Sequence, residues 1–95
     1  MEKLTIKDII KLIDYEQSRE VYAKLVALRM EYIIHSTTEF NAESFEVCYK
    51  VASDTIKKAK MNKIQIFGGI LNQSKELESL GFTRQNMLEV AGLNI

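Results

Sequence analysis

VYAKLVALRMEYII, residues 21–34, decides the fold, because eleven of its fourteen side chains are apolar. Its polar residues are Lys24, Arg29 and Glu31. At about 100° per residue, Lys24 and Glu31 fall on one side of a helix, and Arg29 falls roughly 140° away from Lys24. A helix with so little polar surface must be covered on several sides, either by the rest of its own chain or by a partner.

Capping residues mark the helix boundaries, since the chain has no proline to break a helix. Asp14 followed by Gln17 forms a capping box, which predicts a helix over 15–34. The other caps predict four more helices: Thr5 before 6–13, Asn41 before 42–60, Asn62 with Gln65 before 63–80, and Thr83 before a last short helix.

The segment 42–60 carries one apolar stripe whose spacings of three, four and seven residues trace a helical face. Glutamates lie near its start and lysines near its end, where each charge complements the helix dipole. The stripe consists of Phe45, Cys48, Tyr49, Ala52, Ile56 and Ala59.

Gly68 and Gly69 leave two readings of residues 63–72 open. In a helix each glycine costs roughly 0.5–1 kcal/mol relative to alanine. The rival is a hairpin that pairs KIQIF with ILNQS across a Gly-Gly turn. We favour the helix, because ILNQS is a poor strand and an isolated two-stranded hairpin is only marginally stable. Close helix packing on a glycine surface is the expected role of the pair.

These elements predict an all-α fold in a single domain spanning 1–95. We expect a compact four- to five-helix bundle in which 15–34 and 42–60 form a long antiparallel pair, because short connections place successive helices side by side. The segment 63–80 should pack on that pair.

Composition narrows the function classes. The formal net charge is zero and the pI is about 6.6, which argues against a protein dedicated to coating nucleic acid. A lone cysteine excludes an intrachain disulfide. The first residues, MEKLTIKDII, do not resemble a signal peptide, and 21–34 is too short to span a bilayer, so we expect a cytoplasmic protein without membrane contact.

Few residues of this sequence are candidates for catalysis or for binding a metal or a phosphate. His35 is the only histidine, Cys48 lies on an apolar stripe, and Gly68-Gly69 lacks the lysine that ends a phosphate loop. We therefore expect no enzymatic activity, no cofactor and no metal. A small enzyme or ligand carrier would need a deep, polar-lined cavity beside His35 or Cys48.

The leading hypothesis is a small non-enzymatic interaction module: an adaptor, assembly factor or inhibitor. Tyrosine and methionine are enriched at interfaces, and the 21–34 helix carries two tyrosines with Met30 between them. A protein partner is expected, first of all a second copy in a homodimer. The lysine- and isoleucine-rich, proline-free composition would also suit an accessory protein of a phage or mobile element. The candidate partner-binding residues are Tyr22, Leu25, Leu28, Arg29 and Tyr32.

The alternative hypothesis is a nucleic-acid-binding accessory protein. Residues 50–63 form the only strongly basic stretch, and such a cluster could hold phosphates. Its candidate contacts are Lys57, Lys58, Lys60 and Lys63.

Overall fold

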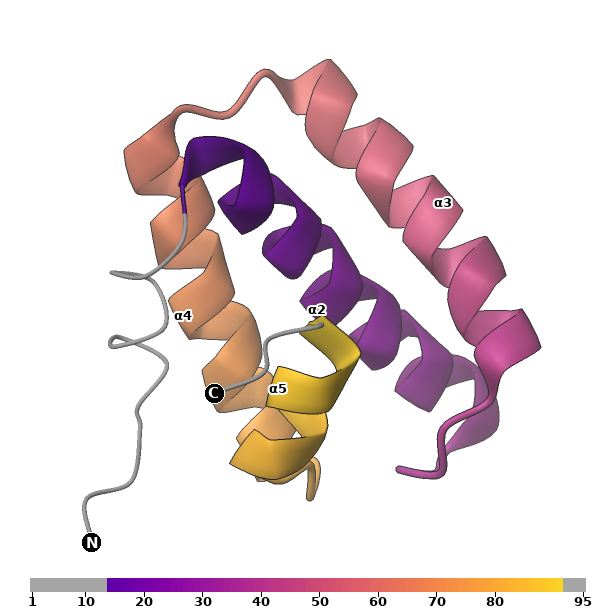
Figure 1. Cartoon of the computed structure of the whole chain (residues 1–95). Coiled ribbons are helices and arrows are strands. Elements are labelled where there is room, and N and C mark those ends of the chain that lie inside the picture. The colour runs from indigo at the N-terminus through magenta and orange to yellow at the C-terminus, as the bar shows by residue number, and fades with distance from the viewer. Residues whose placement is uncertain (1–13, 92–95) are drawn as a thin grey trace, which may run out of the picture.

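The computed structural model describes residues 14–91 of the 95-residue chain. Within that range it is all-helical, without strands, and a compact bundle forms. Residues 63–72 are therefore helix rather than hairpin, whereas the helix predicted over 6–13 lies outside the described residues. The helices are α2 (Tyr15–His35), α3 (Ala42–Ala59), α4 (Lys63–Ser79) and α5 (Arg84–Ala91) (Figure 1).

The predicted caps of α2, α3, α4 and α5 are confirmed, whereas Thr5 lies outside the described residues. Asp14 Oδ1 accepts a hydrogen bond from the Gln17 amide at 2.8 Å, and the Gln17 side chain accepts one from the Asp14 amide at 3.1 Å. The same reciprocal box joins Asn62 and Gln65 at the start of α4. Side chains thus satisfy amides that the first helical turn leaves without partners, which fixes where each helix begins.

The turn between α4 and α5 also follows the sequence. Gly81 has φ +105°, a left-handed conformation that favours glycine. The Phe82 amide donates to the Leu77 carbonyl at 3.0 Å, closing the α4 end as a Schellman motif does. Thr83 Oγ1 then accepts from the Asn86 amide at 3.1 Å and caps α5. The similar ending predicted at Gly92 lies outside the described residues.

Helix α2 is the centre of the molecule. It packs against α3, α4 and α5, whereas the other pairs of described helices contact one another little (Figure 1). The expectation that 63–80 would pack on both members of the long pair is therefore wrong, because α4 packs mainly on α2. The reason is the distribution of apolar residues around α2, which offers separate faces to different neighbours.

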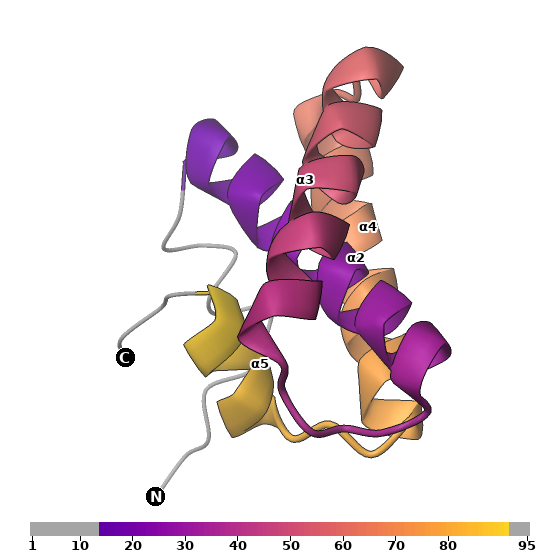
Figure 2. The ribbon, with the colours of Figure 1, turned by 90° about the vertical axis from the view of Figure 1, so that its right-hand side faces the viewer.

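Two clusters of buried side chains occupy those faces. The larger joins α2 to α4 and α5, and the smaller joins α2 to α3. Helices α2 and α3 run in opposite directions, as predicted, and Figure 2 shows that they cross obliquely. The larger cluster contains Val21, Leu25, Leu28, Ile66, Ile70, Leu77, Phe82 and Met87; the smaller contains Ala23, Ala52 and Ile56.

The two glycines of α4 have different surroundings. A Cβ atom built on Gly69 would lie 2.6 Å from Cζ of Tyr22, whereas one on Gly68 would meet no atom within 4 Å. Gly69 therefore allows α4 to approach the Tyr22 ring of α2, as expected for packing on a glycine surface. Gly68 has no such role.

Candidate interaction surface

The candidate partner-binding residues of the 21–34 helix lie against the rest of the chain. Leu25 and Leu28 are 1% and 3% exposed, inside the larger cluster. Tyr22 and Tyr32 are half-buried against it, and the Tyr32 ring meets the Phe82 ring edge-on at 6.0 Å. These side chains are covered by α4 and α5, so they offer little free surface in the folded chain.

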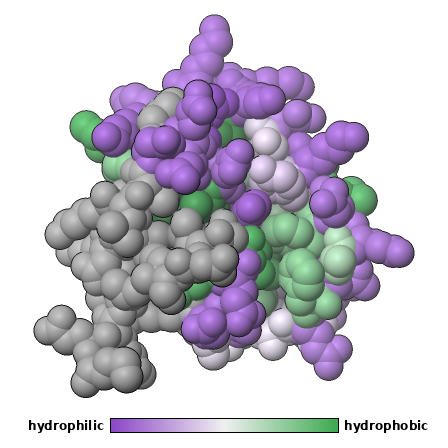
Figure 3. Space-filling model, viewed as in Figure 1, coloured by the Kyte–Doolittle hydropathy of each residue, from purple (hydrophilic) through white to green (hydrophobic). Residues whose placement is uncertain are grey.

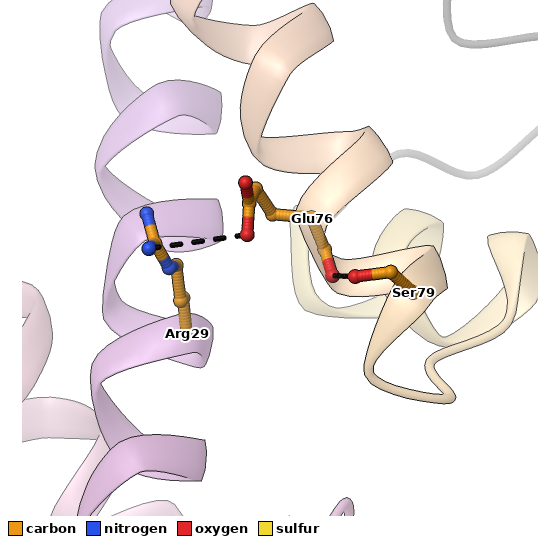
Figure 4. Close-up of polar contacts among 3 residues, drawn as sticks. All are labelled: Arg29, Glu76 and Ser79. Atoms are coloured by element: carbon orange, nitrogen blue, oxygen red, sulfur yellow. Dashed lines mark hydrogen bonds and ion pairs between the residues drawn. The ribbon is translucent and has the colours of Figure 1, made fainter.

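Arg29 shows how the apolar helix accommodates a cation. Its guanidinium lies 3.9 Å from a carboxylate oxygen of Glu76 on α4, and both side chains remain partly exposed (Figure 4). Ser79 Oγ donates to the backbone carbonyl of the same Glu76 at 2.6 Å. A partly exposed ion pair of this kind contributes about 0–1 kcal/mol. Arg29 therefore needs no second chain to balance its charge.

Most of the exposed large apolar side chains lie instead between the last turn of α2 and the middle of α3. Figure 3 shows apolar surface there, at the lower right, bordered by hydrophilic residues. Outside this region, the described part of the chain exposes one further large apolar side chain, Ile64. We call the group the α2–α3 surface; it comprises Ile33, Ile34, Phe40, Val47 and Val51, each at least half exposed.

An aromatic row borders this surface. The Phe40 ring lies 5.2 Å from that of Phe45, and Phe45 stacks on Tyr49 at 6.2 Å with an interplanar angle of 3°. Burial raises the pKa of the Tyr49 phenol above its ordinary value of 10.0, and the Glu20 and Glu46 carboxylates raise that pKa further. Tyr49 is therefore a neutral phenol that packs as an aromatic side chain.

A groove of about 310 Å³ opens beside Phe40. Its lining combines apolar side chains with the polar groups of Thr38, Asn86 and Glu89. A second groove, of about 320 Å³, lies between α2 and α3 and includes Tyr49 and Lys57. Neither is lined by His35 or Cys48. Leu28, Phe40, Phe82 and Val90 form the apolar lining of the first groove.

The basic candidates lie at the opposite end of α3. Lys57 and Lys58 are exposed in its last turn, Lys60 follows in the connection to α4, and Lys63 begins α4. The Lys63 ammonium lies 5.5 Å from the centre of the Phe67 ring. The structure thus brings these four lysines to one end of the molecule, where their charges face water.

The chemically reactive residues do not converge. His35 Nε2 lies 2.9 Å from Ser44 Oγ, which links the end of α2 to the start of α3. Cys48 is buried at 3% exposure, as expected for a small core residue. Over residues 14–91 no group of three histidine, cysteine or acidic side chains has the spacing of a metal site.

Glu31 is a residue that sequence reasoning misplaced. The helical pattern put it on the polar side of the helix with Lys24, yet it is only 2% exposed. Its Oε1 accepts a hydrogen bond from the Asn41 amide at 2.7 Å, and its Oε2 has no hydrogen-bond partner within the described range. The carboxylate therefore anchors the start of α3 to α2.

The α2–α3 surface was also missed, although the pattern contains a signal for it. Val47 and Val51 are four residues apart and fall on the side of α3 opposite to Ala52 and Ile56. Neither valine belongs to the buried apolar stripe of α3, so the pair indicates a second apolar face on this helix.

Comparisons with family models, curated proteins and solved structures return no match for this chain. Among the described helices, none combines the length and apolar character needed to cross a bilayer. The functional inference therefore rests on the surfaces of the chain itself.

Proposed function

We propose that this protein is a small, non-enzymatic interaction module that binds a protein partner through the α2–α3 surface. One observation carries the proposal: nearly all the exposed large apolar side chains of the described chain belong to residues 33–51. Exposed large apolar side chains concentrated in one part of a chain are typical of protein–protein interaction sites. The acidic rim supports the proposal, since Glu39, Glu43 and Glu46 are exposed around it.

The first partner to consider is a second copy of the chain. A formal net charge of zero leaves little long-range repulsion between copies. An adaptor, assembly factor or inhibitor can act as such a dimer, and the composition would suit an accessory protein of a phage or mobile element. Within the 21–34 stretch, Ile33 and Ile34 belong to the α2–α3 surface, and the buried Leu25 and Leu28 support it from inside.

The test compares two substitutions of exposed apolar residues. Val47→Asp puts a charge in the α2–α3 surface, and Ile64→Asp makes the same kind of change at a residue that is 82% exposed on α4. Sedimentation velocity on both variants and on the parent protein should show that only Val47→Asp abolishes association. Equal association in all three proteins would exclude the α2–α3 surface.

Nucleic-acid binding is the second candidate, favoured by the exposure of Lys57, Lys58, Lys60 and Lys63 at one end of the molecule. Phosphate contacts release counterions, so this binding would weaken steeply with salt. Replacing Lys57, Lys58 and Lys60 by glutamate should then abolish retention of a labelled duplex or single strand. Unchanged retention would remove this candidate.

A further inference from the structure

The groove beside Phe40 is continuous with the apolar core. Two of its lining side chains, Leu28 and Phe82, belong to the larger cluster and are only 3% and 5% exposed. Phe40, which precedes α3, is 55% exposed, and Val90 of α5 packs against the same cluster. A group that enters the groove therefore meets apolar side chains that have little contact with water.

The size of the groove fits one large side chain. Its volume is about 310 Å³. A dry cavity of roughly 150 Å³ is enough for a benzene molecule, so the groove can take an aromatic side chain together with parts of its neighbours in a peptide. Removing such a side chain from water is favourable in proportion to the apolar area that is buried. Thr38 and Asn86 add side chains that can hydrogen-bond to a peptide backbone.

The charged side chains at the groove are acidic. Glu89 lines it and is exposed. Glu39 directly precedes the groove residue Phe40, Glu43 follows three residues after it, and both are exposed. Over residues 31–49 the sequence contains no lysine or arginine. Acidic surroundings of this kind favour a positively charged partner.

The basic residues of α2 that are close in sequence to Leu28 do not balance these acidic side chains. Arg29 is paired with Glu76 of α4. Lys24 lies one helical turn before Leu28 and is half-buried. Neither residue lines the groove, so the apolar lining and the acidic side chains beside it are left for a partner to match.

We propose that this groove binds a basic segment of a partner protein, which inserts one large apolar side chain against Leu28 and Phe82 and places its lysines or arginines beside Glu39 and Glu89. This inference rests on the proposed interaction function. It specifies the chemistry of the partner for the part of the α2–α3 surface around Phe40. The inserted side chain supplies most of the affinity, and the exposed acidic side chains select the sign of the partner's charge.

A peptide that contains tryptophan tests the inference directly, because the chain itself contains no tryptophan. The probe is a nine-residue peptide with a tryptophan at its centre, a leucine on each side of it and three lysines at each end. Addition of the parent protein should shift the tryptophan emission to shorter wavelength, as happens when an indole ring leaves water. The matched peptide with glutamates in place of the lysines should bind about tenfold more weakly.

Two pairs of variants locate the contact. Glu89→Lys and Glu16→Lys change the net charge equally, but Glu16 is exposed near the start of α2 and does not line this groove. Glu89→Lys should weaken binding of the lysine peptide by about threefold to tenfold, and by more than Glu16→Lys does. Thr38→Tyr fills the groove, whereas Thr55→Tyr adds the same ring at an exposed position of α3. Only Thr38→Tyr should abolish the emission shift, in a protein that circular dichroism shows to be folded.

The outcomes separate this inference from the proposed function. Equal binding of the two peptides, or equal weakening by the two lysine variants, would overturn the inference, because the acidic side chains at the groove would then not select the partner. Binding without an emission shift would also overturn it, since the peptide would then adhere by charge alone. If Thr38→Tyr abolishes self-association while the parent protein ignores the peptide, the groove belongs to a second copy, and the interaction function stands without this inference. A shift that is selective for the lysine peptide and is lost in Thr38→Tyr supports the inference, whatever the mass of the parent protein in solution.

Discussion

Alanine substitutions at the two adjacent glycines of α4 should have opposite effects on stability. Gly68→Ala meets no atom within 4 Å, so it should gain the helix propensity of alanine, about 0.8–1.0 kcal/mol. Gly69→Ala gains the same propensity but places its Cβ 2.6 Å from Cζ and 2.8 Å from Cε1 of Tyr22.

The overlap at Gly69 should outweigh the gain. Overpacking typically costs about 1–3 kcal/mol, and the Tyr22 ring must leave its place against both clusters of the core. We expect a net loss of about 1 kcal/mol for Gly69→Ala, hence a difference of about 2 kcal/mol between the variants. For a domain of this size that corresponds to a Tm difference on the order of 10 °C.

Thermal unfolding followed by circular dichroism measures the difference directly. Tyr22→Leu should relieve the overlap, so the double variant with Gly69→Ala should be more stable than the sum of the single effects implies. Equal stability of the two alanine variants would refute the close approach of α4 to α2. Destabilisation by both would favour the Gly-Gly turn of a hairpin.

Three further experiments test the core, the α3 anchor and the pH response. Leu25→Ala should cost about 2–5 kcal/mol in urea unfolding because it leaves a cavity in the larger cluster, whereas Val47→Ala should stay within about 0.5 kcal/mol because Val47 is exposed. Glu31→Ala should cost about 2 kcal/mol, since it removes the charged acceptor of the Asn41 amide; Glu31→Gln, which keeps an acceptor oxygen, should cost less. The pKa of Tyr49 is higher in the folded state than its ordinary value of 10.0, so the folded chain holds the phenol proton more tightly than the unfolded chain does. This difference stabilises the folded state below about pH 10, and the stabilisation is lost as the pH rises through the raised pKa. Tyr49→Phe should therefore lose less stability than the parent protein between pH 8 and pH 11. The measurement is the fall in urea midpoint between these two pH values, compared between the two proteins.

Each of these expectations has an opposing result. Equal losses for Leu25→Ala and Val47→Ala would contradict the assignment of the core to one chain. A Glu31→Gln variant as unstable as Glu31→Ala would show that the Asn41 contact matters little. Parallel pH curves for the parent protein and Tyr49→Phe would show that Tyr49 titrates alike in both states.

The helices could be predicted because their signals are local. Asp14, Asn41 and Asn62 each precede a run of good helix formers, and their side chains cap amides only three residues away. Gly81 likewise marks a left-handed turn by its own lack of a side chain. Such contacts depend on short stretches of sequence and not on how the helices assemble.

The arrangement of the helices around α2 could not be predicted in the same way. An apolar pattern that covers most of a helix requires neighbours but does not say which ones or how many. The sequence therefore leaves open whether the same chain or a partner covers the 21–34 helix, and in the structure α3, α4 and α5 cover it. Glu31 shows the same limit, because its burial depends on the Asn41 amide of the next helix.

The measurement that tests the central claim most directly is solution mass by light scattering on a sizing column, at low and high salt, for the parent protein and for Val51→Asp. One chain has a mass of 10.9 kDa. We predict that the parent protein exceeds this mass as its concentration rises, in both salts because the centre of the contact is apolar, and that Val51→Asp elutes as a folded single chain. A parent protein that stays at the mass of one chain, or a Val51→Asp variant that associates as the parent does, would contradict association through the α2–α3 surface.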